Sequence, residues 1–143
     1  MILYGANPDI VQWVSQRLTG IPNYFDAGSV ALGIVVENNL ICGVVYSGFR
    51  LKPDGSPLLI EMSIASIDKR WCTRHNLKAI FAVPFIQYGL ERVQLTTSVN
   101  NVEVNSMAER WGFQKEGIHR KADIFGGDAI SYGMLREDCR WLK

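Results

Sequence analysis

The spacing of hydrophobic and polar residues changes along the chain between a period typical of helices and one typical of strands. Apolar residues at helical spacing predict helices, and runs rich in β-branched residues between turn residues predict strands. Helices are expected at residues 10–18, 74–88 and 102–111. Strands are expected at residues 29–37, 40–49, 58–66, 92–98, 114–120 and 129–135.

Turn and capping residues mark where these elements begin and end. Asn7-Pro-Asp can cap the first helix, and Asn38-Asn39 predicts a hairpin turn between two strands. Pro84 should kink or shorten the middle helix because proline lacks an N–H, and Gly89 is a suitable stop. The order of elements predicts a mixed sheet with helices on its faces. The strand–turn–helix–strand unit in the middle is expected to be a right-handed crossover.

Length and composition narrow the class of protein. The chain has 143 residues, of which 48% are hydrophobic and 20% charged, and this fits a single globular domain over residues 1–143. The formal net charge of +1 does not favour binding to nucleic acid or to a membrane surface. No apolar run reaches the roughly 18 residues of a membrane span, and the N-terminus does not resemble a signal peptide.

The cysteines and histidines do not predict a metal site. Cys42, Cys72 and Cys139 are an odd number without metal-ligand spacing, and neither His75 nor His119 has a partner at such spacing. A reduced, cytoplasmic protein without a metal is therefore expected.

Residues 100–117 carry the most specific motif. They read Asn-Asn-Val-Glu-Val-Asn-Ser-Met-Ala-Glu-Arg-Trp-Gly-Phe-Gln-Lys-Glu-Gly. This stretch closely resembles the Asn-x-x-(Ser/Ala)-x-x-x-x-Glu-(Lys/Arg)-x-Gly-Phe-x-x-Glu-Gly pattern of the GNAT N-acetyltransferase superfamily. Within that superfamily the chain looks nearest to the ribosomal-protein N-terminal acetyltransferases. The resemblance covers residues 58–117 well, and residues 29–49 and 129–142 more loosely.

The resemblance implies a fold and a reaction. The fold would be the α/β (α+β) acyl-CoA N-acyltransferase (GNAT) fold, a mixed, mostly antiparallel sheet of about 6–7 strands flanked by helices. The reaction would move an acetyl group from acetyl-CoA to a primary amine on a protein N-terminus, a lysine or a small molecule. Two alternatives stay open: a catalytically weak or inactive module of this fold that binds a partner protein, and a different acyl-CoA donor.

The turn after the strand at 58–66 would hold the pyrophosphate of coenzyme A. The family uses a glycine-rich loop at a helix start, and here Cys72 and Arg74 stand at its glycine positions. Arg70 and Arg74 could supply charge instead, since guanidinium groups bind phosphate in a fork geometry. The alternative is a solvated basic turn without a ligand. The expected cofactor-binding residues of this turn are Arg70, Trp71, Cys72, Thr73, Arg74, His75 and Asn76.

The strand itself would pair with the pantetheine arm. Met62, Ser63 and Ile64 match the family's cofactor strand, with a backbone N–H near Ser63 holding the acetyl carbonyl as a catalytic group. Glu61 aligns with the Glu of the Glu-Ile-Gly-Tyr strand in the ribosomal-protein branch. It is the predicted general base, because an ammonium must lose a proton before it attacks. The alternative for Glu61 is a solvated position or an ion pair with an arginine.

Asn101 aligns with the family Asn near the pantetheine arm, where an amide can both donate and accept. Its alternative role is a helix N-cap, and the two roles can coexist. The acids that protonate the departing thiolate in the family are missing, since their positions are Ala108 and Val104. Ser98 and Ser106 are alternative donors.

The acceptor amine cannot be identified from a motif. The chain has no acidic cleft motif for polyamines or aminoglycosides, and no basic face for docking to a ribosome. The chain resembles compact acetyltransferase-like proteins of tailed phages in two segments, residues 132–142 and Arg70-Trp71. Trp71, Trp111 and Trp141 fit either a core or an interface, so a homodimer is left open.

Overall fold

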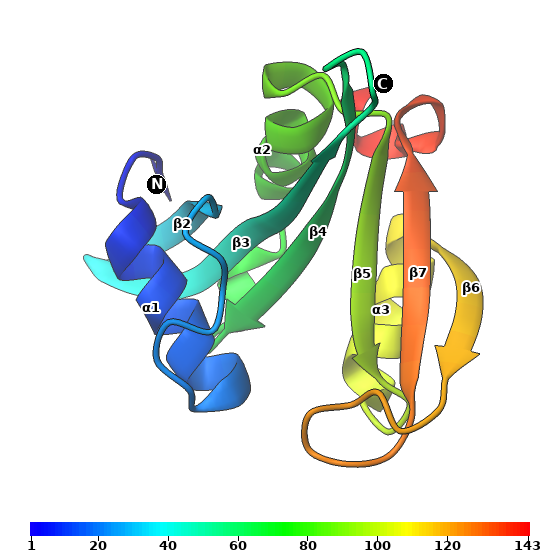
Figure 1. Cartoon of the computed structure of the whole chain (residues 1–143). Helices are drawn as coiled ribbons and strands as arrows, with labels where there is room; N and C mark the ends of the chain where they lie inside the picture. Colours follow the sequence, from blue (N-terminus) through cyan, green and yellow to red (C-terminus); the bar gives the residue numbers. More distant parts are fainter.

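A computed structural model describes residues 1–143 as one seven-stranded sheet with three α-helices (Figure 1). The strands follow the order β1-β2-β3-β4-β5-β7-β6, and only β4 and β5 are parallel neighbours. The predicted fold class, a mixed and mostly antiparallel sheet flanked by helices, is confirmed. The elements are β1 (Ile2–Leu3), α1 (Asn7–Thr19), β2 (Val30–Val36), β3 (Asn39–Leu51), β4 (Pro57–Ser66), α2 (Arg74–Ala82), β5 (Arg92–Ser98), α3 (Val102–Trp111), β6 (Gln114–His119) and β7 (Ala129–Leu135).

The middle helix is shortened at its proline, as predicted. α2 ends at Ala82, and the chain continues as a single π-helical turn over Val83–Gln87. The Tyr88 N–H donates to the Val83 carbonyl at 3.1 Å, the wider spacing that defines such a turn. The proline at position 84, which has no N–H to give, is thereby accommodated near the end of the helix.

Two predicted boundaries are wrong. Asn7 does not cap α1, whose N-cap is Ala6; the Asn7 Oδ1 instead accepts from the Ala31 N–H at 3.0 Å and ties the helix to β2. The hairpin turn between β2 and β3 lies one residue earlier than Asn38-Asn39. Glu37 and Asn38 both have positive φ, 52° and 65°, so Asn39 already begins β3.

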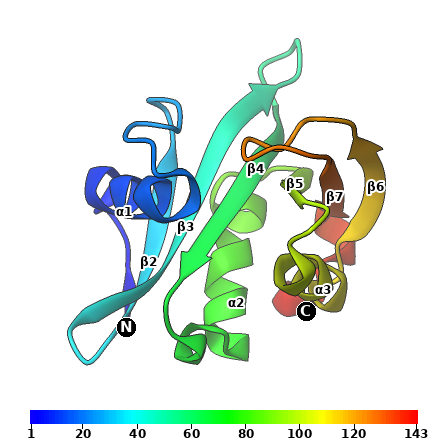
Figure 2. The same cartoon turned by 90° about the horizontal axis from the view of Figure 1, so that it is seen from below.

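The two faces of the sheet are covered by different helices (Figure 2), and each face carries its own hydrophobic cluster. α1 covers one face with a small cluster that includes Ile10, Val14 and Val45. α2 and α3 cover the other face with a larger cluster that contains Ile60 and Met62 of β4. Because side chains alternate along a strand, Glu61, between these two residues, and Ala65, beyond them, turn to the face of α1. None of the helices combines the length and the apolar composition that spanning a membrane requires.

β4 and β5 separate from one another along most of their length. Their pairing is limited to Leu59–Glu61 against Arg92–Gln94. Beyond these residues the two strands diverge, and a split opens in the sheet at their C-terminal ends (Figure 1). The parallel pairing of β4 and β5 around α2 agrees with the predicted crossover, and it places the split next to the start of that helix.

Candidate active site

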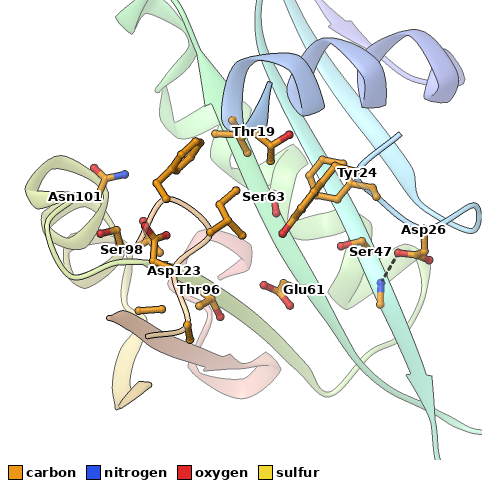
Figure 3. Close-up of a pocket in the computed structure, with 18 residues that line it drawn as sticks. Thr19, Tyr24, Asp26, Ser47, Glu61, Ser63, Thr96, Ser98, Asn101 and Asp123 are labelled. Carbon is orange, nitrogen blue, oxygen red and sulfur yellow. Dashed lines mark hydrogen bonds between the residues drawn. The ribbon is translucent and has the colours of Figure 1, made fainter. Parts of the chain in front are cut away.

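Two cavities open at the split, and their lining residues carry opposite charges. The first, of about 590 Å³, contains Asp26, Glu61 and Asp123 and is called the acidic cavity (Figure 3). The second, of about 970 Å³, lies between the end of β4, the start of α2, and α3, and is called the basic cavity. Leu18 and Asn101 line both cavities, so the two spaces meet at the split.

The basic cavity gathers cations from four separate regions of the chain. Only one carboxylate, that of Glu103, lines the same space. None of the cations forms an ion pair within the protein, although the Arg74 and Arg140 guanidinium groups lie 6.0 and 4.8 Å from the Trp141 ring centre. Their charge is therefore available to an anionic ligand. The cations are Arg17, Lys69, Arg74, Arg110 and Arg140.

The start of α2 offers backbone donors to this cavity. Thr73 caps the helix, and its Oγ1 accepts from the Asn76 N–H at 3.1 Å. The N–H groups of Arg74 and His75 make no hydrogen bond within the protein. Cys72 has φ −87°, a value that any L-residue adopts, so this turn does not need a glycine there.

The predicted turn residues divide into two groups. Trp71, Cys72 and Arg74 line the basic cavity. Arg70 lies outside it and is paired with Asp68 at 2.8 Å and with Glu37 at 3.1 Å. The sequence predicts that Arg70 and Arg74 both bind phosphate, but only Arg74 lines the cavity. Thr73, His75 and Asn76 also lie outside the cavity lining, although the cap and the backbone donors belong to the same turn.

The register of β4 shows which backbone groups face the split. The Ile67 N–H donates to the Ile41 carbonyl of β3, so every second residue back from Ile67, including Ser63, turns its N–H to β3. Ile64 is one of the alternate residues, whose backbone N–H and C=O groups point toward β5. Because the pairing with β5 ends at Glu61, the Ile64 N–H and C=O have no strand partner on that side. The candidate donor for a carbonyl oxygen is therefore the Ile64 N–H, one residue beyond Ser63.

The neighbouring predicted strand residues have different surroundings. The Met62 side chain is fully buried in the core, whereas Ile64 lines the basic cavity. The Ser63 side chain lines the acidic cavity beside Glu61 (Figure 3). β4 thus forms the wall between the two cavities.

Glu61 is half-buried in the acidic cavity and makes no ion pair. Burial raises the pKa of its carboxyl, and the side chain of Thr96 partly opposes that shift. A carboxylate with a raised pKa accepts a proton more readily at neutral pH. The position has the chemistry of a general base.

Asn101 caps α3, which is one of its two predicted roles, and its role beside the pantetheine arm stays a prediction. Its Oδ1 accepts from the Val104 N–H at 3.3 Å and caps α3, while the residue lines both cavities. Ala108, at the position of the family's tyrosine acid, is fully buried in the core. Of the alternative acids, Ser98 lines the acidic cavity and Ser106 lines neither.

Sequence reasoning missed the loops that complete the acidic cavity. The segment between α1 and β2 contributes Tyr24 and Asp26, and the segment between β6 and β7 contributes Asp123 and Phe125. These loops are about a hundred residues apart in the sequence and contain no motif. The one available signal was the apolar pair Ile124-Phe125, which is followed by two glycines in the same loop.

The remaining predictions concern the tryptophans and a possible metal site. Trp71 and Trp111 are buried and pack edge to face at 5.6 Å, and the Trp141 Nε1 donates to the Trp111 carbonyl. No three His, Cys, Asp or Glu side chains are grouped so that they could hold a metal ion.

Comparison with solved structures identifies the fold. The F149A mutant of spermidine N-acetyltransferase SpeG from Vibrio cholerae matches over 100% of this chain and 98% of its own, with a TM-score of 0.74 and 14% identity. The chain has the fold of the GNAT acetyltransferases. Ribosomal-protein-S5-alanine acetyltransferase from Vibrio fischeri shares this GNAT fold at a TM-score of 0.65 and 19% identity, over 78% of this chain and 64% of its own.

A third GNAT structure was determined with a ligand. RimL, a ribosomal L7/L12 alpha-N-protein acetyltransferase in complex with coenzyme A, matches over 75% of this chain and 62% of its own, with a TM-score of 0.60 and 16% identity. The chain spans less than two thirds of the length of both ribosomal-protein enzymes. Comparison with protein-family models finds no match, and comparison with curated proteins finds none either. The likeness therefore establishes the GNAT fold, which confirms the resemblance seen in the sequence.

Proposed function

We propose that the protein is an N-acetyltransferase that moves an acetyl group from acetyl-CoA to a primary amine. The observation that supports this is the split between β4 and β5, with an open strand edge between a basic and an acidic cavity. A phosphorylated donor and an amine acceptor would approach that edge from its two sides.

The basic cavity fits the phosphorylated end of coenzyme A. Its five cations have no carboxylate partner, and the Arg74 and His75 N–H groups at the helix start are free donors for phosphate oxygens. Arg74 and Lys69 would hold the phosphates, and the open edge at Ile64 would pair with the amide-containing arm as an added strand. Acetyl-CoA supplies an acetyl thioester when bound.

The residues at the split have separate roles in the transfer. The Glu61 carboxylate would take the proton from the attacking ammonium, directly or through water. The Ile64 N–H would donate a hydrogen bond to the carbonyl oxygen that gains charge during attack. The amine would then displace the thiolate, which is a fair leaving group even where a tyrosine acid is replaced by Ala108.

One observation favours a second candidate, a GNAT-fold binding module without turnover. The position of the usual acid is a buried alanine, and the Tyr132 hydroxyl is engaged by the Asn105 Oδ1 at 2.7 Å. Such a module would bind acetyl-CoA and a partner protein but release no coenzyme A when an amine is added. Release of free thiol therefore distinguishes the two candidates.

The test is calorimetric titration of the protein with acetyl-CoA, followed by a thiol-release assay with primary amines. Wild-type protein should bind acetyl-CoA with a micromolar Kd. Arg74→Ala should weaken binding about tenfold, because it removes a charge from the phosphate site. Arg70→Ala is the matched control: the same charge is lost four residues away but outside the cavity, so Kd should change by less than about twofold. Absence of binding at millimolar acetyl-CoA would reject the proposal.

A further inference from the structure

The acidic cavity contains three carboxylates and no cation. Asp26, Glu61 and Asp123 line it, and no lysine, arginine or histidine does. The chain as a whole has a net charge of only +1, so this is a local separation of charge. A space lined by charges of one sign attracts a ligand of the other sign and raises its local concentration.

The three carboxylates are not neutralised within the protein. Asp123 is half-buried and its carboxylate makes no hydrogen bond or ion pair. Asp26 accepts through Oδ1 from the Gly48 N–H and the Ser29 hydroxyl, both at 3.2 Å, and its Oδ2 is free. In the view of Figure 3, Glu61 lies between Asp123 and Asp26. Each carboxylate is therefore available to a separate cationic group.

The rim of the same cavity is apolar. Tyr24, Ile124 and Phe125 line it while remaining 45%, 52% and 73% exposed. Methylene groups of a ligand would cover these side chains, and the two aromatic rings would also attract an ammonium group. The cavity thus combines carboxylates with apolar surface, which suits an alkyl chain that carries several amines.

We propose that the acceptor is an aliphatic diamine or polyamine, an inference that rests on the proposed acetyl transfer. Glu61 would serve the reacting amine, and Asp26 and Asp123 would each be available to pair with an ammonium that does not react. The volume of about 590 Å³ falls within the range of about 300–1,000 Å³ that is typical of small-molecule sites. A singly charged amine would leave two of the three carboxylates without a counter-charge.

The transfer balances without any further reactant. The ammonium gives one proton to Glu61, and the free amine nitrogen forms the new bond to the acetyl carbon; the second proton that this nitrogen loses as the amide forms passes to the departing sulfur, which leaves as the free thiol. The carbon–sulfur bond breaks with its electron pair on sulfur. The product keeps the remaining positive charges of the amine, so Asp26 and Asp123 hold it until exchange with solvent.

The experiment compares amines of different charge, two of which, 1,4-diaminobutane and n-butylamine, have the same four-carbon chain. With acetyl-CoA saturating, kcat/KM would be measured for 1,4-diaminobutane, spermidine, n-butylamine and a short peptide with a free N-terminus and a lysine, by thiol release and product mass. The two polycations should exceed n-butylamine and the peptide by at least about tenfold. Equal rates for n-butylamine, or a preference for the peptide, would overturn the inference while leaving acetyl transfer in place.

Variants that replace single carboxylates with amides test whether the preference for polycations depends on Asp26 and Asp123. Asp26→Asn and Asp123→Asn should each lower kcat/KM for 1,4-diaminobutane about tenfold, which is a larger loss than for n-butylamine, and should keep the acetyl-CoA Kd, which also shows that they fold. Asp9→Asn is the control, since Asp9 is exposed on the first turn of α1, about 15 Å along the helix from Thr19 of the cavity. An equal effect of all three variants would reject the site. Binding of acetyl-CoA without acetylation of any amine would reject both proposals.

Discussion

The Glu61 carboxylate combines two properties that rarely occur together on a strand. It is half-buried, so that burial raises its pKa, and it has no cation nearby to lower the pKa again. The neighbouring carboxylates of the acidic cavity are the same sign, and none of them relieves the charge. A group in this state is suited to proton transfer, and the fold stabilises its ionised form poorly.

Replacing Glu61 with glutamine should therefore separate catalysis from stability. Because the pKa is raised in the folded state, that state holds the proton more tightly than the unfolded chain, and stability is lost as pH rises from the ordinary value of 4.5 through the raised one. Glu61→Gln cannot ionise, so its Tm should exceed that of the wild type at pH 8 and match it below about pH 4. At the same time kcat should fall about 10²–10⁴-fold with the acetyl-CoA Kd unchanged.

Thermal unfolding across this pH range and steady-state kinetics would check both parts. Asp54→Asn is a suitable control for the stability measurement, because burial has little influence on Asp54 and its pKa is lowered by Ser56. A wild type that is the more stable protein at pH 8 would show that Glu61 is ion-paired instead, and equal stability at both pH values would show that it is solvated.

At the scale of elements, the hydrophobic pattern was sufficient for most of the sheet and its helices. β5, β7 and α3 have the predicted bounds, because each has apolar residues at the spacing of its element and is bounded by clear turn residues. β1 was missed, since two residues carry no period. The cap at Asn7 was wrong because a tertiary partner, the Ala31 N–H, competes for the same side-chain oxygen. Local patterns cannot report such a competitor.

Only the part of the candidate site that is continuous in the sequence could be predicted. Glu61, Ile64 and Arg74 lie within one continuous stretch whose order resembles a family motif. Asp26 and Asp123 come from loops that meet only after folding, so no spacing rule connects them. The sequence therefore predicted residues of β4 and of the start of α2, and it did not predict the loop residues of the acidic cavity.

α1 lies close to the sheet because two glycines face it. Gly33 and Gly43 are paired across β2 and β3, and a Cβ on Gly43 would lie 2.5 Å from the Val14 Cγ2 and 3.1 Å from the Ile10 Cγ2. Both of those side chains belong to the small cluster under the helix. α1 also supplies Leu18 to both cavities, so its distance from the sheet affects the shape of the site.

Gly43→Ala should consequently lower the free energy of unfolding by about 1–3 kcal/mol, the usual cost of overpacking a filled core. Gly28→Ala is the matched control, because its nearest neighbour would be 3.7 Å away and its φ is not positive. It should change stability by no more than about 1 kcal/mol in either direction. Chemical denaturation measures both variants, and equal effects would mean that α1 is not held against the sheet at Gly43.

On the scale of the whole molecule, the split divides the sheet into two halves joined by three residue pairs of β4 and β5. β1 to β4 with α1 form one half, and β5 to β7 with α3 form the other, while the larger hydrophobic cluster under α2 continues across both. A ligand in the split would replace the strand pairing that is missing there. The open edge at Ile64 and the cations on both sides are the features on which we base the proposal that acetyl-CoA lies across this division.

Hydrogen exchange resolved by residue tests that arrangement. In the free protein the amides of Ile64 and Ser66 should exchange faster than those of Ser63 and Ala65, because the first pair faces the split and the second pair faces β3. Acetyl-CoA should slow the Ile64 amide most, because the pantetheine arm would pair with it. Adenosine 3′,5′-diphosphate has the phosphates without the arm, and it should protect Arg74 and His75 but leave Ile64 unchanged. Protection of Ser63 in place of Ile64 would show that the strand edge is read in the wrong register, and it would move the oxyanion donor back by one residue.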